Sequence, residues 1–384
     1  MQILLQEMKK IFHPIMIFIC IFINLLMYYL FIEFHINHFP NGRPALDHYR
    51  IATEMVHQYG AELDQEEFNH FKDIYQEEIH KADKWIQAND ELKELGIVSY
   101  EQFQSMEANH KQFETIKNDL IFEQEIDLFW EIPVREELLE NMEMVEEYYG
   151  YRHLLTAPTE KEELRIKEIV SSQAVNSIFP AFPVEDNFFE ISKYILITIL
   201  ISVIFMISPI FIKDYKNNLI ALQYISKTGR RLFRSKVAAG MLSAFMITTI
   251  LVAVYYSIYS TNEVAMFLNS GINSFMGSIY WYDLTFQQLI MMTIILTYVL
   301  VLSFALLAIV VSNICKNYIS LIVLQLPIFV TICILITRGY LLGEAFLIQN
   351  SQIYLYALYL LFVLIPLLLC LWRQKVEAKI DITY

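Results

Sequence analysis

The stretch Ile191-Ser-Lys-Tyr-Ile-Leu-Ile-Thr-Ile-Leu-Ile-Ser-Val-Ile-Phe-Met-Ile-Ser-Pro-Ile-Phe-Ile212 decides the fold class, because no charged residue follows Lys193 within it. A hydrocarbon core of about 30 Å needs roughly 20 apolar residues in helical form. We therefore predict that this stretch crosses a membrane. Five further stretches have the same character, and they cover residues 14–34, 237–260, 287–312, 318–337 and 353–372. Prolines interrupt three of these runs, at Pro209, Pro327 and Pro366, and they predict kinks. A membrane helix tolerates such a kink when neighbouring groups form hydrogen bonds with the carbonyls that it frees.

The charged residues of the chain are gathered in one block. The chain has 384 residues, is 56% hydrophobic and carries a net charge of −14, and 33 of its 42 Asp and Glu lie between residues 35 and 188. Such a block is a water-soluble domain, and its acidity argues against a nucleic-acid partner, because a polyanion would be repelled. The sequence therefore predicts an all-α membrane protein of six transmembrane helices, with a mostly helical domain inserted after the first. The predicted domains are 1–34 (an amphipathic segment and the first span), 35–189 (the inserted domain) and 190–384 (spans two to six).

The distribution of Lys and Arg predicts the orientation. The loop 213–236 carries seven of them and should be cytoplasmic, whereas 261–286 carries none. Alternation from that loop puts both chain ends inside and residues 35–189 outside a plasma membrane. The seven cations are Lys213, Lys216, Lys227, Arg230, Arg231, Arg234 and Lys236.

The inserted domain shows helix signals and no convincing strand. Asp64 with Glu67, and Thr159 with Glu162, have the spacing of capping boxes. Ser99 with Gln102 predicts the start of a helix that runs through Leu120, after a segment that Gly96 ends. Pro133 is expected in the first turn of a further helix.

Several classes of chemistry have no motif here. The chain has no G-x-x-x-x-G-K-[ST] sequence, no H-E-x-x-H sequence and no regular spacing among its His residues. Ionisable residues are nearly missing from the middle of the six stretches, which disfavours an ion-coupled transporter. We therefore expect no catalytic residue, metal or cofactor in this chain. The four cysteines lie in or beside apolar stretches and predict no disulfide; they are Cys20, Cys315, Cys333 and Cys370.

The loop 213–236 has two interpretations of about equal weight when it is taken alone. It is either a short helix-turn unit that docks a cytosolic partner, with Gly229 permitting the turn, or a set of cations that only fixes the orientation. Residues 338–352 are similarly ambiguous, between an external gate hairpin and an ordinary interfacial loop.

The layout as a whole resembles that of type-2 ABC (ABC-2) exporter permeases of low-GC Gram-positive bacteria. Those proteins have an amphipathic N-terminal segment, a first span, a large external domain and five more spans. The opening Glu7-Met-Lys-Lys-Ile-Phe12 is similar to the elbow helix of the family, and Ser226-Lys-Thr-Gly-Arg-Arg-Leu-Phe-Arg-Ser-Lys236 to its coupling region. The resemblance implies an elbow that includes Glu7, Lys9, Lys10 and Phe12. It implies ATPase-coupling residues Ser226, Lys227, Thr228, Gly229, Arg230, Arg231, Leu232, Phe233 and Lys236.

The expected function is therefore that of a membrane permease subunit, not an enzyme. The resemblance implies cytosolic ATPase subunits that bind ATP and magnesium, and a second permease subunit, identical or related, in the same membrane lipids. One rival is a membrane receptor or scaffold that senses a peptide or cell-wall ligand through the inserted domain. A membrane enzyme is a weaker rival, since the sequence offers no buried polar constellation.

Overall fold

The computed structural model describes residues 2–106, 111–123, 126–143, 145, 158–217, 229 and 232–379. Helices dominate the described residues, which contain isolated β-bridges but no β-strand. The chain divides into two compact units. The first unit holds residues 1–39, 187–263 and 288–384, and the second holds 40–186 and 264–287.

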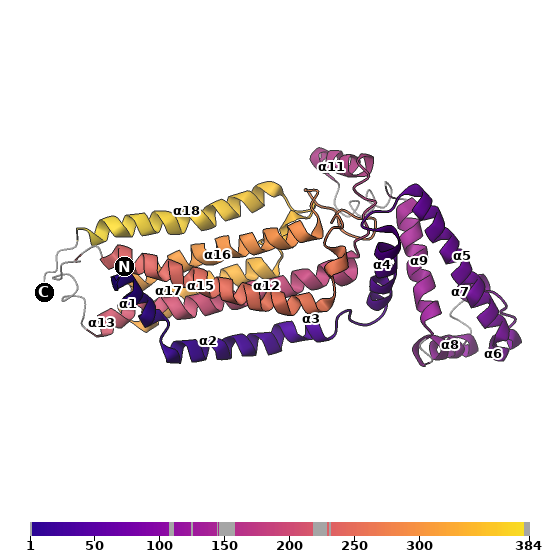
Figure 1. The fold of residues 1–384 in the computed structure, drawn as a ribbon, viewed down its shortest axis with the longest axis horizontal. Coiled ribbons are helices and arrows are strands. Elements are labelled where there is room, and N and C mark those ends of the chain that lie inside the picture. The colour runs from indigo at the N-terminus through magenta and orange to yellow at the C-terminus, as the bar shows by residue number, and fades with distance from the viewer. Residues whose placement is uncertain are drawn as a thin grey trace. The chain divides into compact units, whose positions relative to one another are not determined.

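The first unit is a bundle of helices (Figure 1), and it contains the six apolar helices that the sequence predicts. Each is long and apolar enough to cross a membrane, which indicates a multi-pass membrane protein. The first span combines α2 (Pro14–Met27), a π-helical turn (Tyr28–Ile32) and α3 (Glu33–Asn37). The others are α12 (Asp186–Ile207), α15 (Leu232–Tyr259), α16 (Phe286–Ile314), α17 (Tyr318–Thr337) and α18 (Gln352–Glu377).

The six helices differ sharply in how far the bundle buries them. In the most apolar window of each span, 78% of residues are buried for the span that contains α12, but only 6% for α2–α3 and 11% for α18. The span that contains α12 is therefore the centre of the bundle, and α2 and α18 lie at its margins (Figure 1). Their outer faces are apolar, as expected of surfaces that contact lipid.

Pro209 interrupts the central span as the sequence predicts. Ser208–Ile210 form a turn of 3-10 helix, and the chain then continues as α13 (Ile212–Lys216). Side chains from other helices bond the carbonyls of this break: Ser312 donates to the carbonyl of Ser208, and Lys236 donates to that of Ile210 at 3.1 Å. The break is therefore satisfied from within the protein. Pro327 and Pro366, in contrast, lie inside continuous helices, α17 and α18.

A short amphipathic helix, α1 (Gln2–Ile11), precedes the first span. The chain changes direction after α1 because Pro14 follows, and the residue before a proline avoids the helical region of φ and ψ. That residue, His13, is extended with ψ of 137°. The ring of His13 then caps α2 by accepting from the N–H of Ile15 at 3.4 Å. This corner makes α1 a separate element.

The second unit is built mainly from helices that pack around their own core. They are α4 (Ala45–Tyr59), α5 (Gln65–Ala88), α6 (Asp90–Glu94), α7 (Tyr100–Ser105), α8 (Lys111–Asn118), α9 (Asp127–Glu143) and α11 (Glu160–Ser171). Phe103, Phe113 and Phe129 are buried in one cluster with residues of α5, α6 and α8. Both predicted capping boxes are confirmed, at Asp64 with Glu67 and at Thr159 with Glu162.

Two helix boundaries differ from the prediction. The helix that Ser99 caps ends at Ser105, because Met106 is extended with ψ of 122°, and it does not run on to Leu120. Pro133 lies inside α9 and not in its first turn. Buried neighbours on both sides of that proline, Ile132 and Val134, hold the helix against the core and offset the missing N–H.

Residues 264–287 also belong to the second unit and are held by long-range contacts. Arg165 of α11 donates to Asp283 at 2.7 Å and to the carbonyl of Tyr280 at 3.3 Å. The hydroxyl of Tyr280 is hydrogen-bonded to Glu185. These bonds join residues 264–287 to α11 and to Glu185.

Candidate functional site

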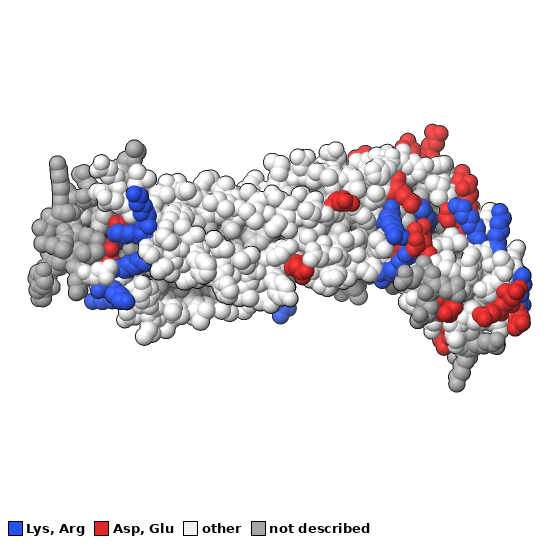
Figure 2. Space-filling model, turned by 60° about the horizontal axis from the view of Figure 1, so that its bottom comes forward, with Lys and Arg blue, Asp and Glu red and all other residues white. Residues whose placement is uncertain are grey.

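Three elements meet at one end of the bundle. They are α1, α13 and the first turns of α15, and the two latter elements flank the loop that the sequence analysis singled out. Together they contribute four ionisable side chains to a group that we call the ion cluster: Glu7 and Lys10 from α1, Asp214 from α13 and Lys236 from α15. Lys and Arg gather at this end of the bundle, the left end in Figure 2, whereas the adjoining bundle surface is mostly uncharged.

The ion cluster alternates acids and bases. Lys10 Nζ lies 2.7 Å from Glu7 Oε1 and 3.3 Å from Asp214 Oδ1. Lys236 Nζ is paired with Asp214 Oδ2 and lies 3.9 Å from Glu7 Oε2. The four side chains therefore form a closed arrangement in which each cation faces both carboxylates.

The ion cluster lies in the interior of the protein. Glu7, Asp214 and Lys236 are 4%, 2% and 1% exposed, and Lys10 is half-buried. Burial alone would lower the pKa of Lys10, but the carboxylates of Glu7 and Asp214 outweigh it and raise that pKa above its usual value. Two cations and two anions make the group neutral, which is the condition under which buried charges are tolerated.

Lys236 has further partners besides the carboxylates. Its ammonium lies 4.7 Å from the centre of the Phe211 ring, in a cation–π arrangement, and Phe233 packs against the same ring at 5.7 Å. Because Lys236 also bonds the carbonyl freed at the Pro209 break, it joins α15 to the end of the central span. The residues around the loop are thus fixed to one another by polar and aromatic contacts.

The structure places part of the residue set that the sequence analysis assigned to coupling. Gly229 has φ of +45°, the left-handed conformation expected of a turn glycine. Leu232 and Phe233 begin α15, and Phe233 is buried. Ser226, Lys227, Thr228, Arg230 and Arg231 lie outside the described residues.

The four residues predicted for the elbow helix divide into two pairs. Glu7 and Lys10 turn inward and belong to the ion cluster, whereas Lys9 is exposed. Phe12 is half-buried and lines a groove between α2 and α15. Only one side of α1 is therefore joined to the bundle.

Asp214, the acid that pairs with both lysines of the ion cluster, is not among the residues predicted for coupling. A local signal existed: Asp214 is a lone acid between Lys213 and Lys216, directly after an apolar span. An acid at the end of an apolar span needs a cation if it is buried. Its two partners, however, lie in α1 and α15, far from it in the sequence.

Comparison of the chain with models of protein families, with curated proteins and with solved structures finds no match.

Proposed function

We propose that this chain is the transmembrane permease subunit of an ATP-binding cassette exporter. The observation that carries the proposal is the ion cluster, which ties α1, the end of the central span and the start of α15 together on both sides of the basic loop 213–236. A force applied to that loop would reach α13 and α15 directly, because separating the buried charges is costly.

The energy for transport would come from another polypeptide. The sequence contains no P-loop, and the middle of the six spans contains almost no ionisable residue through which an ion gradient might act. In this proposal the basic loop and both chain ends are cytoplasmic, and residues 35–189 are extracellular. ATP-driven closure of two ATPase subunits would push on the loop and tilt the two spans that flank it.

The proposal is tested by reversing charge in the loop. Arg230→Glu combined with Arg231→Glu should leave the protein inserted, because five other Lys and Arg remain in the loop to fix its orientation. The purified complex should lose its ATPase subunit or lose ATP-driven export. Truncating one partner of a buried charge pair costs about 2 to 5 kcal/mol of binding, or roughly thirtyfold or more in affinity.

The matched control reverses two exposed cations of the second unit, Lys81→Glu with Lys93→Glu, whose side chains are 60% and 48% exposed. That variant should behave like the parent protein. If the loop variant still copurifies an ATPase and exports normally, the loop serves only to orient the protein. If the parent protein copurifies no ATPase and responds instead to a peptide or cell-wall fragment, the receptor or scaffold is the better description.

A further inference from the structure

The connection between the C-terminal end of α17 and the start of α18 forms a pocket of about 460 Å³. It is lined by residues of the α17–α18 connection, which includes the 3-10 turn η8 (Gly343–Phe346), and by residues of the first turns of α18. All of them belong to the first unit. The lining residues are Tyr340, Ala345, Gln349, Asn350, Ser351, Tyr354, Leu355 and Leu358.

The connection that forms the pocket is anchored to the bundle. Glu344 is paired with Lys193 of α12 at 2.6 Å, and Tyr359 donates to the carbonyl of Leu341. Asn350 closes the turn by donating to the carbonyl of Glu344 at 2.8 Å. Gly343 lies directly against the ring of Phe189, where a Cβ would fall within 2.1 Å of a ring carbon. The pocket is therefore formed before any ligand arrives.

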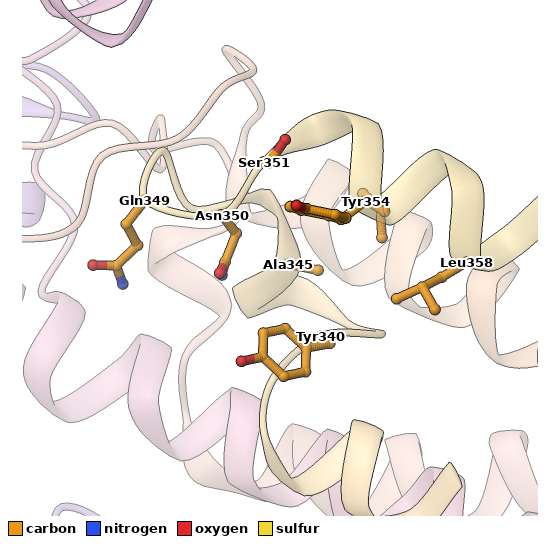
Figure 3. Close-up of a pocket in the computed structure, with 8 residues that line it drawn as sticks. Tyr340, Ala345, Gln349, Asn350, Ser351, Tyr354 and Leu358 are labelled. Carbon is orange, nitrogen blue, oxygen red and sulfur yellow. The ribbon is translucent and has the colours of Figure 1, made fainter. Parts of the chain in front are cut away.

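The lining changes from polar to apolar across the pocket. Figure 3 shows Tyr340 and Tyr354 on opposite sides, with their hydroxyls turned toward the end where Gln349 and Asn350 lie, and Leu358 at the other end. Tyr340 is 47% and Tyr354 is 74% exposed, so both rings are accessible to a ligand. An aromatic ring with a polar tip is typical of the boundary between membrane and water.

None of the eight lining residues is charged. Glu344, next to the lining residue Ala345, is already paired with Lys193. Arg338, exposed two residues before Tyr340, does not line the pocket. Carboxamides and phenols donate and accept hydrogen bonds without adding charge, so they match hydroxyl groups better than phosphates. A phosphate would be expected to meet Arg or Lys in its site.

We propose that this pocket binds a neutral amphiphile whose head group carries hydroxyls, such as a sugar joined to acyl chains. The hydroxyls would bond Gln349 and the two phenols, the rings would contact the head group, and the chain would lie along Leu355 and Leu358. The proposal requires that α17 and α18 are embedded in a membrane, and it does not depend on export by an ATPase.

The test uses the full chain, purified in a detergent without sugar groups and reconstituted in phosphatidylcholine nanodiscs. Monoglucosyl diacylglycerol with a diazirine in its acyl chain is activated by light, and the labelled peptides are mapped by mass spectrometry. We expect labelling concentrated in residues 340–358, which excess octyl glucoside suppresses. Two control probes carry the same diazirine on phosphatidylcholine and on phosphatidylglycerol, and both should label these residues much less.

Substitutions connect the labelling to the pocket. Tyr354→Ala and Gln349→Ala should each weaken glucosyl-lipid binding about tenfold, the change that corresponds to the loss of 1.4 kcal/mol. Tyr356→Ala is the matched control, because Tyr356 is 57% exposed on the same helix and does not line the pocket. Equal labelling by phosphatidylcholine would mean that any bilayer lipid fills the pocket and would overturn the proposal. A preference for phosphatidylglycerol would assign lipid binding to the exposed Arg338 nearby and would overturn the proposal. Equal loss of glucosyl-lipid binding in Tyr354→Ala and Tyr356→Ala would overturn the proposal as well.

Discussion

Lys236 is the residue whose loss should damage the ion cluster most. Lys236→Met leaves the carboxylates of Glu7 and Asp214 buried and removes the cation that is paired with Asp214. Breaking a buried pair in this way typically costs about 3 to 5 kcal/mol. We expect a correspondingly lower free energy of unfolding for the purified protein in detergent.

The double variant Lys236→Met with Asp214→Leu is the control, because it leaves the Glu7–Lys10 pair at 2.7 Å intact. It should recover most of the lost stability, since both charges of the broken pair are gone. Stability losses that simply add would show that the two side chains do not act together.

Asp127 should make the second unit sensitive to acid. A hydrogen bond from the guanidinium of Arg43 lowers the pKa of Asp127, with a smaller contribution from Arg50, which lies 3.2 Å away. The ion pair therefore stabilises the folded state fully when the pH is well above the usual Asp pKa of about 3.9. This stabilisation is lost as the pH falls through the lower pKa that Asp127 has in the folded state.

Asp127→Asn should therefore reduce stability at pH 7 and have little effect at a pH below the folded-state pKa. The loss should be at most about 1 kcal/mol, because the Asp127 side chain is 53% exposed. Tryptophan fluorescence reports the unfolding, and one contributor is Trp130, whose ring centre lies 5.6 Å from Cζ of Arg43. A stability difference that stays constant with pH would contradict this assignment.

At the scale of single residues, the sequence indicated the cations of the candidate site but not the acid between them. Lys236 and Lys10 lie in stretches whose charge pattern is local and visible. The role of Asp214 depends on partners from α1 and α15, and no spacing along the chain predicts that meeting. Burial of an acid is a tertiary property, so it became evident only in the folded chain.

Among the six spans, the first has the smallest buried share of its apolar window. One polar residue near its middle, Asn24, forms hydrogen bonds with two other helices. Asn24 donates to Ser202 of α12 at 2.8 Å and accepts from the hydroxyl of Tyr255 on α15 at 3.1 Å. Hydrogen bonds between membrane helices contribute about 0.6 kcal/mol on average and up to about 1.7.

Asn24→Leu should therefore lower the free energy of unfolding by about 1 to 2 kcal/mol. Thr331→Val is the control, because the Thr331 hydroxyl bonds only the carbonyl of Pro327 in its own helix among the described contacts. If the two variants lose the same small amount, the contacts of Asn24 do not fasten α2 to the bundle. Thermal unfolding in detergent measures both.

Helix starts that carry a capping motif were predicted better than the other helix boundaries. The capping boxes at Asp64 and Thr159 consist of residues three apart, so the sequence contains their whole signal. The end of α7 at Ser105 and the interior place of Pro133 depend on packing against other helices, which no local spacing encodes.

At the scale of the whole molecule, the second unit is assembled from two separate parts of the chain. Residues 264–287 contribute Asp283 and Tyr280, which bond Arg165 and Glu185 of the longer part. Phe286 packs against Phe179 at 5.0 Å between ring centres. This association is not predictable from the sequence, because the two parts are separated by two of the apolar helices.

A fragment of residues 40–186 should therefore be helical but incompletely stable. The core around Phe103 and Phe129 lies wholly within it, whereas α11 would lose its bonds to residues 280 and 283. Appending residues 264–287 through a flexible Gly-Ser linker of about 20 residues should raise the melting temperature. Circular dichroism measures both fragments, and identical melting would show that the appended segment adds no stability.

The sparse burial of α2 and α3 also has a consequence for synthesis of the protein. About 150 residues separate the end of α3 from the start of α12, and a ribosome that adds 5 to 20 residues per second needs roughly 8 to 30 s to make them. During that delay the first span has none of its later neighbours to pack against. Only 6% of the apolar window of this span is buried in the folded protein, so the span loses few packing contacts while it is alone in lipid. Chaperones of membrane insertion would then be needed for the central α12, whose neighbours α15 and α16 emerge after it, more than for the span that enters first.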